Sequence, residues 1–238
     1  MKKSCRFQYL IVQLTVALLV GALVSPLGIH PAHATTLNVT ATVSTIPIIQ
    51  ITAPAIHITN GSVYAGSAVP AFLDGTALPF LYCVDILRDI YIPGTYATTF
   101  TFNGMVHGKS VVNMGQVAWL LDTYASSAAS DPTKKQTAAL QAAIWEVIYG
   151  DQFTLTDGPS TVLSQYNTYM NAFNAALLTG SGTASVANYV WLSPVSPVYG
   201  QMQGLVTRVP EPSSTLLLAL ALSGLFGVGW WHHKRAQE

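Results

Sequence analysis

The chain has 238 residues and a formal net charge of zero, with 8% charged and 50% hydrophobic residues. Between Thr35 and Val209 it carries eight acidic and five basic residues, a net charge of −3. It has no basic patch and no stripe of basic and aromatic residues, which argues against nucleic acid as a partner. His57 and His107 have no metal-ligand spacing, and no HExxH or paired CxxC occurs, so we expect neither a metal nor a cofactor.

The first 34 residues have the order of a secretory signal peptide. Three basic residues precede an apolar run from Leu10 to Val24, and the small-residue site Ala32-His33-Ala34 follows. We predict cleavage after Ala34, which would place the mature chain outside the cytoplasm. The alternative is an uncleaved anchor.

The next part of the chain has the signs of β-strands. Apolar and polar residues alternate from Leu37 to Ser44, and β-branched residues continue from Ile46 to Ile51. A short apolar run from Phe80 to Leu87 predicts a buried strand that carries Cys83. Alternation returns from Tyr96 to Phe102, and Asn103-Gly104 after it predicts a hairpin turn.

The period of the apolar residues then changes to that of helices. We predict a first helix from Val112 to Tyr124. A second begins at Asp131-Pro132, with Asp131 as the N-cap and the proline at the first helical position, and ends at Gly150. A third apolar stripe runs from Val162 to Leu177 and ends at Gly180.

Strand-like sequence returns from Tyr189 to Leu192 and from Gln203 to Arg208. The order of strands, helices and strands predicts one α+β domain over residues 35–208. We expect a β-sandwich or β-barrel with a helical insertion.

Residues 209–238 form a short linker, an apolar segment and a basic end. The apolar segment, 214–231, is long enough to cross a membrane as a helix. The basic cluster from His232 to Arg235 then lies on the cytoplasmic side. This pattern predicts an inner-membrane anchor with the body of the protein outside the cytoplasm.

In the order Pro210, Glu211, Pro212, apolar helix and basic end, this tail resembles the PEP-CTERM sorting signal. The resemblance implies a Gram-negative host and an exosortase as a partner, a membrane peptidase that removes the tail. It also implies release to the cell surface or to an extracellular matrix.

The chain has two cysteines, and Cys5 lies in the predicted signal peptide. Cys83 is therefore the only cysteine of the predicted mature chain and has no partner for an internal disulfide. It is an inert buried thiol, half of an intermolecular disulfide, a catalytic nucleophile, or a thiol consumed by another kind of bond.

Two stretches resemble the bacterial thioester domain, also called the TQXA domain. They are Leu81-Tyr82-Cys83-Val84-Asp85 and Leu140-Gln141-Ala142-Ala143-Ile144-Trp145, with Leu140 where the family has Thr. A third family element, a late glutamine followed by apolar residues, corresponds to Met202-Gln203-Gly204-Leu205-Val206.

This second resemblance implies a thioester between Cys83 Sγ and the side-chain carbonyl of Gln203, with Gln141 as the alternative partner. Gln141, Trp145 and Asp85 would then support the bond. We expect an exported surface protein, not an enzyme, that attaches covalently to amine or hydroxyl groups of an unknown surface or matrix target.

Two other functions stay open. One is a non-reactive structural or extracellular-matrix protein delivered by the same sorting signal. The other is a cysteine hydrolase with Cys83, His107 and an aspartate, which requires a low-pKa thiolate beside a histidine.

Overall fold

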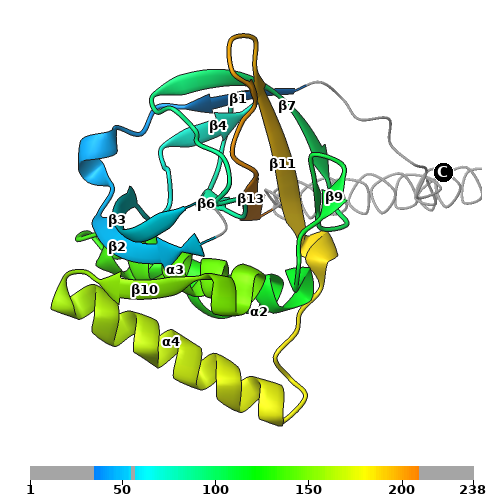
Figure 1. Cartoon of the computed structure of the whole chain (residues 1–238). Helices are drawn as coiled ribbons and strands as arrows, with labels where there is room; N and C mark the ends of the chain where they lie inside the picture. The colour runs from blue at the N-terminus through cyan, green and yellow to red at the C-terminus, as the bar shows by residue number, and fades with distance from the viewer. Residues whose placement is uncertain (1–34, 55–56, 209–238) are drawn as a thin grey trace, which may run out of the picture. The chain divides into compact units, whose positions relative to one another are not determined.

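The computed structural model describes residues 35–54 and 57–208 (Figure 1). The predicted signal peptide (1–34), the sorting motif Pro210-Glu211-Pro212 and the predicted membrane helix (214–231) lie outside the described residues. No helix within the two described ranges is both long and apolar enough to cross a membrane.

The main structural element is an antiparallel sheet of eight strands. Its order is β5-β4-β1-β7-β11-β13-β6, and β12 pairs with β11. The strands are β1 (Thr35–Val39), β4 (Ala71–Leu73), β5 (Thr76–Ala77), β6 (Tyr82–Cys83), β7 (Gly94–Thr101), β11 (Tyr189–Ser196), β12 (Gly200–Gln201) and β13 (Leu205–Arg208).

This sheet curls until its two edges approach each other (Figure 1). Strands β5 and β6 follow one another in the chain but lie at opposite ends of the strand order. The N–H of Ala68 donates to the carbonyl of Leu81, and that of Leu78 to the carbonyl of Ala71, both at 2.9 Å. The segment between β5 and β6 therefore lies against the start of β4.

Three helices are inserted between the strands, which completes a mixed α/β domain. They are α2 (Met114–Ala129), α3 (Lys135–Tyr149) and α4 (Ser160–Leu178), and they lie between β9 and β11 in the chain. The element order confirms the prediction of strands interrupted by a helical insertion. Helix α3 packs against both α2 and α4, so that it is buried on most of its faces.

Two smaller sheets and three short 3-10 helices are the remaining elements that the structure describes in full. Strand β2 buries Ile49 and Ile51 in the same core as the helices, while β3 is largely exposed. The elements are the sheet β10 (Thr154–Asp157), β2 (Ile48–Ala53) and β3 (Ile58–Tyr64), the hairpin β8 (Met105–Val106) and β9 (Lys109–Ser110), and η1 (Val43–Thr45), η3 (Gly150–Gln152) and η4 (Val186–Asn188).

Strand β11 separates two hydrophobic cores. Alternate residues of a strand point to opposite faces of its sheet. Val190 and Leu192 therefore pack in the core enclosed by the curled sheet, while Tyr189 and Trp191 pack with the helices. Cys83 contacts both cores, so it lies where the sheet meets the helical layer.

The structure corrects three local predictions. Helix α3 begins at Lys135, because Lys134 adopts a left-handed conformation with φ of 60°. Asp131 lies before this helix, but its carboxylate still accepts a hydrogen bond from a backbone N–H of the first turn, that of Gln136 at 2.9 Å. The predicted second-helix start at Asp131-Pro132 is therefore several residues too early.

The other two corrections concern strands. Asn103-Gly104 forms no hairpin with β7, because β7 pairs with β1 and β11 while β8 pairs with β9. The predicted strand from Phe80 to Leu87 is reduced to β6, because a loop follows Cys83. The Asp85 carboxylate holds this loop by accepting the N–H of Leu87 at 3.0 Å.

Candidate functional site

Strand pairing brings the side chain of Cys83 to that of Gln203. Strands β6 and β13 are antiparallel, with Cys83 opposite Leu205, and the N–H of Val84 donates to the carbonyl of Gly204 at 2.9 Å. Gln203 comes just before this paired segment. The Cys83 Sγ lies 2.9 Å from Gln203 Oε1, although the two residues are 120 positions apart in the sequence.

Helix α3 holds Cys83 from its other side. Gln141 Nε2 donates to the carbonyl of Cys83, and Gln141 Oε1 accepts the Cys83 N–H, both at 2.8 Å. The side chain thus takes the place of a neighbouring strand at the edge of the sheet. Gln141 is fully buried, and these two bonds supply a partner to the oxygen and to the nitrogen of its amide.

The backbone around Gln203 is fixed as well. The N–H of Gln203 donates to the carbonyl of Asp89 at 3.0 Å, and the N–H of Met202 to that of Pro194 at 3.0 Å. His107 Nε2 lies 2.7 Å from the carbonyl oxygen of Met202. Since a carbonyl only accepts, this nitrogen carries the proton.

Asp85 organises the loop after β6. Its carboxylate accepts the N–H of Leu87 and pairs with the guanidinium of Arg88, which also donates to Gln201 Oε1 at 3.2 Å. Within residues 35–54 and 57–208 it makes no hydrogen bond to Cys83 or Gln203. Asp85 therefore holds the loop that carries the pocket residues Ile86, Arg88 and Asp89.

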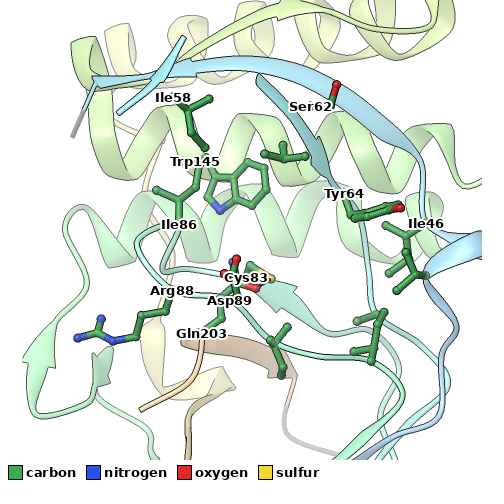
Figure 2. A pocket seen from close by; sticks show the side chains of 16 residues that line it. Ile46, Ile58, Ser62, Tyr64, Cys83, Ile86, Arg88, Asp89, Trp145 and Gln203 are labelled. Carbon is green, nitrogen blue, oxygen red and sulfur yellow. Dashed lines mark hydrogen bonds between the residues drawn. The ribbon is translucent and has the colours of Figure 1, made fainter. Parts of the chain in front are cut away.

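A pocket of about 280 Å³ opens beside Cys83 and Gln203 (Figure 2). Its walls come from β3 and the segment before β2 on one side, and from the loop after β6 on the other. Isoleucine side chains supply much of the apolar surface, and Arg88 and Asp89 supply the charges. The isoleucines are Ile46, Ile58, Ile86, Ile90 and Ile92.

Trp145 also lines this pocket. Its ring packs on Phe153 at a centroid distance of 5.9 Å, and 2% of the residue is exposed. The indole N–H has no hydrogen-bond partner among the described residues. Figure 2 shows the indole nitrogen on the side of the ring that faces Cys83. An unpartnered buried donor costs about 1–3 kcal/mol.

The surroundings of Cys83 disfavour ionisation of its thiol. Burial raises the pKa of the Cys83 thiol above its ordinary value, and the nearby charge of Asp85 adds to the rise. Burial also lowers the pKa of His107, although its hydrogen bond to Met202 opposes this. No hydrogen bond joins His107 to Cys83 in the part of the chain that the structure describes. These features are unlike the low-pKa thiolate beside a histidine that a cysteine hydrolase needs.

The structure brings together Cys83, Gln203, Gln141 and Trp145, which the sequence analysis singled out. Asp85 lies beside them without a direct bond. Sequence analysis missed the pocket wall from Ile46 and β3 and the contact between His107 and Met202, because no local pattern marks them. No group of His, Cys, Asp and Glu side chains in the described ranges could hold a metal ion.

Comparison with known proteins identifies the C-terminal segment. No curated protein and no solved structure matches the chain. Residues 208–235 match the PEP-CTERM protein-sorting motif, which confirms the prediction made from Pro210, Glu211 and Pro212. This motif implies export, membrane-associated sorting and recognition by an exosortase. The chain therefore carries the PEP-CTERM sorting signal of an exported, exosortase-processed protein.

Proposed function

We propose that this exported protein forms a thioester between Cys83 and Gln203 and uses it as a covalent anchor to a surface or matrix target. It reacts once, with an amine or hydroxyl group, and is not a turnover enzyme. The observation that carries the proposal is the 2.9 Å contact between Cys83 Sγ and Gln203 Oε1. Thioester domains, which the sequence resembles around Cys83 and Gln141, supply the precedent.

Formation of the bond needs the sulfur and the amide carbon in contact. Because a C=O bond is about 1.2 Å long, the carbonyl carbon of Gln203 lies within roughly 4.1 Å of Sγ. Attack needs about 3–3.5 Å, so a small rotation of the Gln203 side chain is enough. The S–C bond forms first and gives a tetrahedral carbon. The C–N bond then breaks, and the thiol proton leaves with the amide nitrogen as ammonia.

Gln203 is a better acyl partner than Gln141. The Gln141 amide is already bonded to both backbone polar groups of Cys83. To acylate Sγ it would have to give up both bonds inside the core, where unpaired polar groups are costly. Gln203 Oε1, in contrast, already contacts the sulfur. We therefore assign Gln141 the role of holding Cys83 in position.

The same surroundings favour survival of the bond. Burial raises the pKa of the Cys83 thiol, so opening of the thioester by any nucleophile must deliver a proton to the departing sulfur. The isoleucines of the pocket limit the access of water. A bound amine or hydroxyl of the target attacks the Gln203 carbonyl, the S–C bond breaks, and the nucleophile's proton passes to the sulfur. The products are an amide or ester at Gln203 and a free thiol at Cys83.

Intact-mass spectrometry of the purified protein tests the proposal. We expect a mass one ammonia below that of the processed sequence, and addition of one methylamine on treatment with that amine. The matched control is Cys83→Ala, which should show the full mass and no reaction. A wild-type protein with full mass and a rapidly labelled thiol would contradict the proposal and leave the non-reactive structural or matrix protein.

A further inference from the structure

The strongest feature not used so far is the indole N–H of Trp145. It is a hydrogen-bond donor in a residue that is 2% exposed, it has no partner among the described residues, and its residue lines the same pocket as Cys83 and Gln203. Buried donors in folded proteins nearly always have a partner. The buried hydroxyls of Tyr82, Thr98 and Tyr169 also lack a partner among the described residues, but of these four side chains Trp145 is the one that lines the pocket. There its donor can be paired at another stage of the reaction.

Both steps of thioester chemistry create such a group. When sulfur attacks the Gln203 amide, or an amine attacks the thioester, the carbonyl oxygen becomes an oxyanion on a tetrahedral carbon. A donor placed toward that oxygen stabilises the charge as it develops. Burial strengthens the effect, because the interaction is less screened than in water.

The backbone donors nearby are already occupied. The N–H of Cys83 bonds Gln141, that of Val84 bonds Gly204, and that of Gln203 bonds Asp89. Each is part of the framework that positions the site. Among these neighbours, Trp145 Nε1–H is the donor without a structural partner.

Resting on the proposed thioester, we propose that Trp145 donates its indole N–H to the oxyanion at Gln203 Cδ, both when the bond forms and when a nucleophile opens it. The hydrogen bond is made to the oxygen as its charge appears and is released when the carbonyl re-forms, so no atom is gained or lost. Trp145 is then a catalytic residue of the single-turnover reaction.

Helix α3 makes this role geometrically reasonable. Gln141 and Trp145 are four residues apart, so they lie on the same face of the helix. One face thus holds the backbone of Cys83 and presents the donor to the reacting carbonyl. Packing of the indole on Phe153 fixes the plane of the ring.

The test is Trp145→Phe, which keeps an aromatic ring and removes the N–H. We expect a folded protein in which opening of the thioester by methylamine is about 10²–10³-fold slower, the usual effect of losing one oxyanion donor. Thioester formation after refolding should slow by a similar factor. The rates are measured by intact mass over time, and circular dichroism checks the fold.

Trp119→Phe is the matched control. Trp119 lies on α2, packs on Phe173 at 5.7 Å and is no part of the pocket. Its substitution should leave both rates unchanged. If Trp145→Phe does not fold, replacing Trp145 with benzothienylalanine preserves the ring shape while sulfur takes the place of the N–H, and the same slowing is expected.

The outcomes separate this inference from the proposed function. A wild-type protein without the ammonia deficit would overturn both. A wild-type thioester together with unchanged rates in either Trp145 variant would overturn only the role of the indole. Slowing in Trp145→Phe but not in the benzothienylalanine protein would also overturn it, because the loss would then come from the shape of the ring.

Discussion

Strand β13 has a polar cluster at each end, and the two clusters use their side chains differently. At the Leu205 end, Cys83 contacts Gln203 and is held by Gln141. At the other end, Asp122 Oδ1 accepts Arg208 Nη2 at 2.7 Å and the hydroxyl of Tyr189 at 2.6 Å.

The two clusters differ in charge, in exposure and in whether their buried donors are paired. In the Asp122 cluster opposite charges meet, and the side chains of Arg208 and Asp122 keep 42% and 32% of their surface exposed. In the Cys83 cluster burial raises the pKa of the thiol, and the indole N–H of Trp145 has no partner in the part of the chain that the structure describes. Cys83 and Trp145 line the same pocket. Among the described residues, every buried polar side-chain atom of the Asp122 cluster has a partner, whereas Trp145 Nε1 has none. Under the proposed function, the first end of β13 takes part in a reaction, and the second end holds the strand.

The largest effect is expected on the ammonia deficit, which should respond differently to substitution of the neighbouring Gln203 and Gln201. Gln203→Met removes the acyl group, so we expect the ammonia deficit and all reaction with methylamine to disappear. Gln201→Met is the matched control, because Gln201 is exposed and its carbonyl accepts Arg88 instead. It should keep the full deficit in intact-mass spectra. If the Gln203→Met variant still lacks the mass of one ammonia, the acyl partner of Cys83 would be Gln141.

The second prediction concerns the free thiol in Gln203→Met. Since burial raises the pKa of Cys83, the thiolate fraction is small at neutral pH. As long as the pH is below that pKa, the fraction increases about tenfold for each unit by which the pH rises. Labelling by iodoacetamide should therefore keep rising between about pH 8 and pH 10, where an ordinary cysteine with a pKa of about 8.5 levels off. Labelling rates followed by mass against a cysteine peptide measure this. A plateau near pH 9 would show that the thiol is not desolvated.

The third prediction concerns the support from α3. Gln141→Leu leaves the N–H and carbonyl of Cys83 without their partners, which should lower the free energy of unfolding by about 2–4 kcal/mol. Urea unfolding in a Cys83→Ala background measures the loss without a contribution from the cross-link. Gln136→Leu, on the same helix but only partly buried, should stay within about 0.5 kcal/mol. Equal losses of unfolding free energy in the two variants would contradict the role of Gln141 in holding the backbone of Cys83.

The smallest effect is expected at the other end of β13. Arg208→Met breaks a partly exposed ion pair, so the free energy of unfolding should fall by only about 0–1 kcal/mol. The ammonia deficit should stay complete, as intact mass will show. Loss of the deficit would mean that the two ends of the strand are coupled, which their separate hydrogen bonds do not suggest.

Local patterns predicted the parts of the site that a single element carries. The apolar run around Cys83 indicated a short buried strand, and the spacing of Gln141 and Trp145 placed both on one face of a helix. The three helices and the alternation of β1 and β7 were recognisable for the same reason, since their periods follow directly from backbone geometry.

What the sequence left open depends on contacts between distant segments. The family resemblance suggested that Cys83 meets Gln203, with Gln141 as the alternative. The contact itself depends on β6 pairing with β13, with Cys83 and Gln203 120 positions apart, and no local pattern encodes that register. The same holds for the loop role of Asp85, which needs Arg88 and the backbone of Leu87 in place. The pocket wall from β3 depends on a separate small sheet packing beside the site.

The position of Gln203 near the end of the described chain has a mechanical consequence. Strand β13 ends at Arg208, only five residues after Gln203. In a protein held from its C-terminal side, a target bonded to the Gln203 side chain would pull on the backbone between these two residues alone. The helices and the other strands would lie outside the line of tension. The strength of the attachment to the target would then depend on covalent bonds, and the domain would not have to resist unfolding under the applied force.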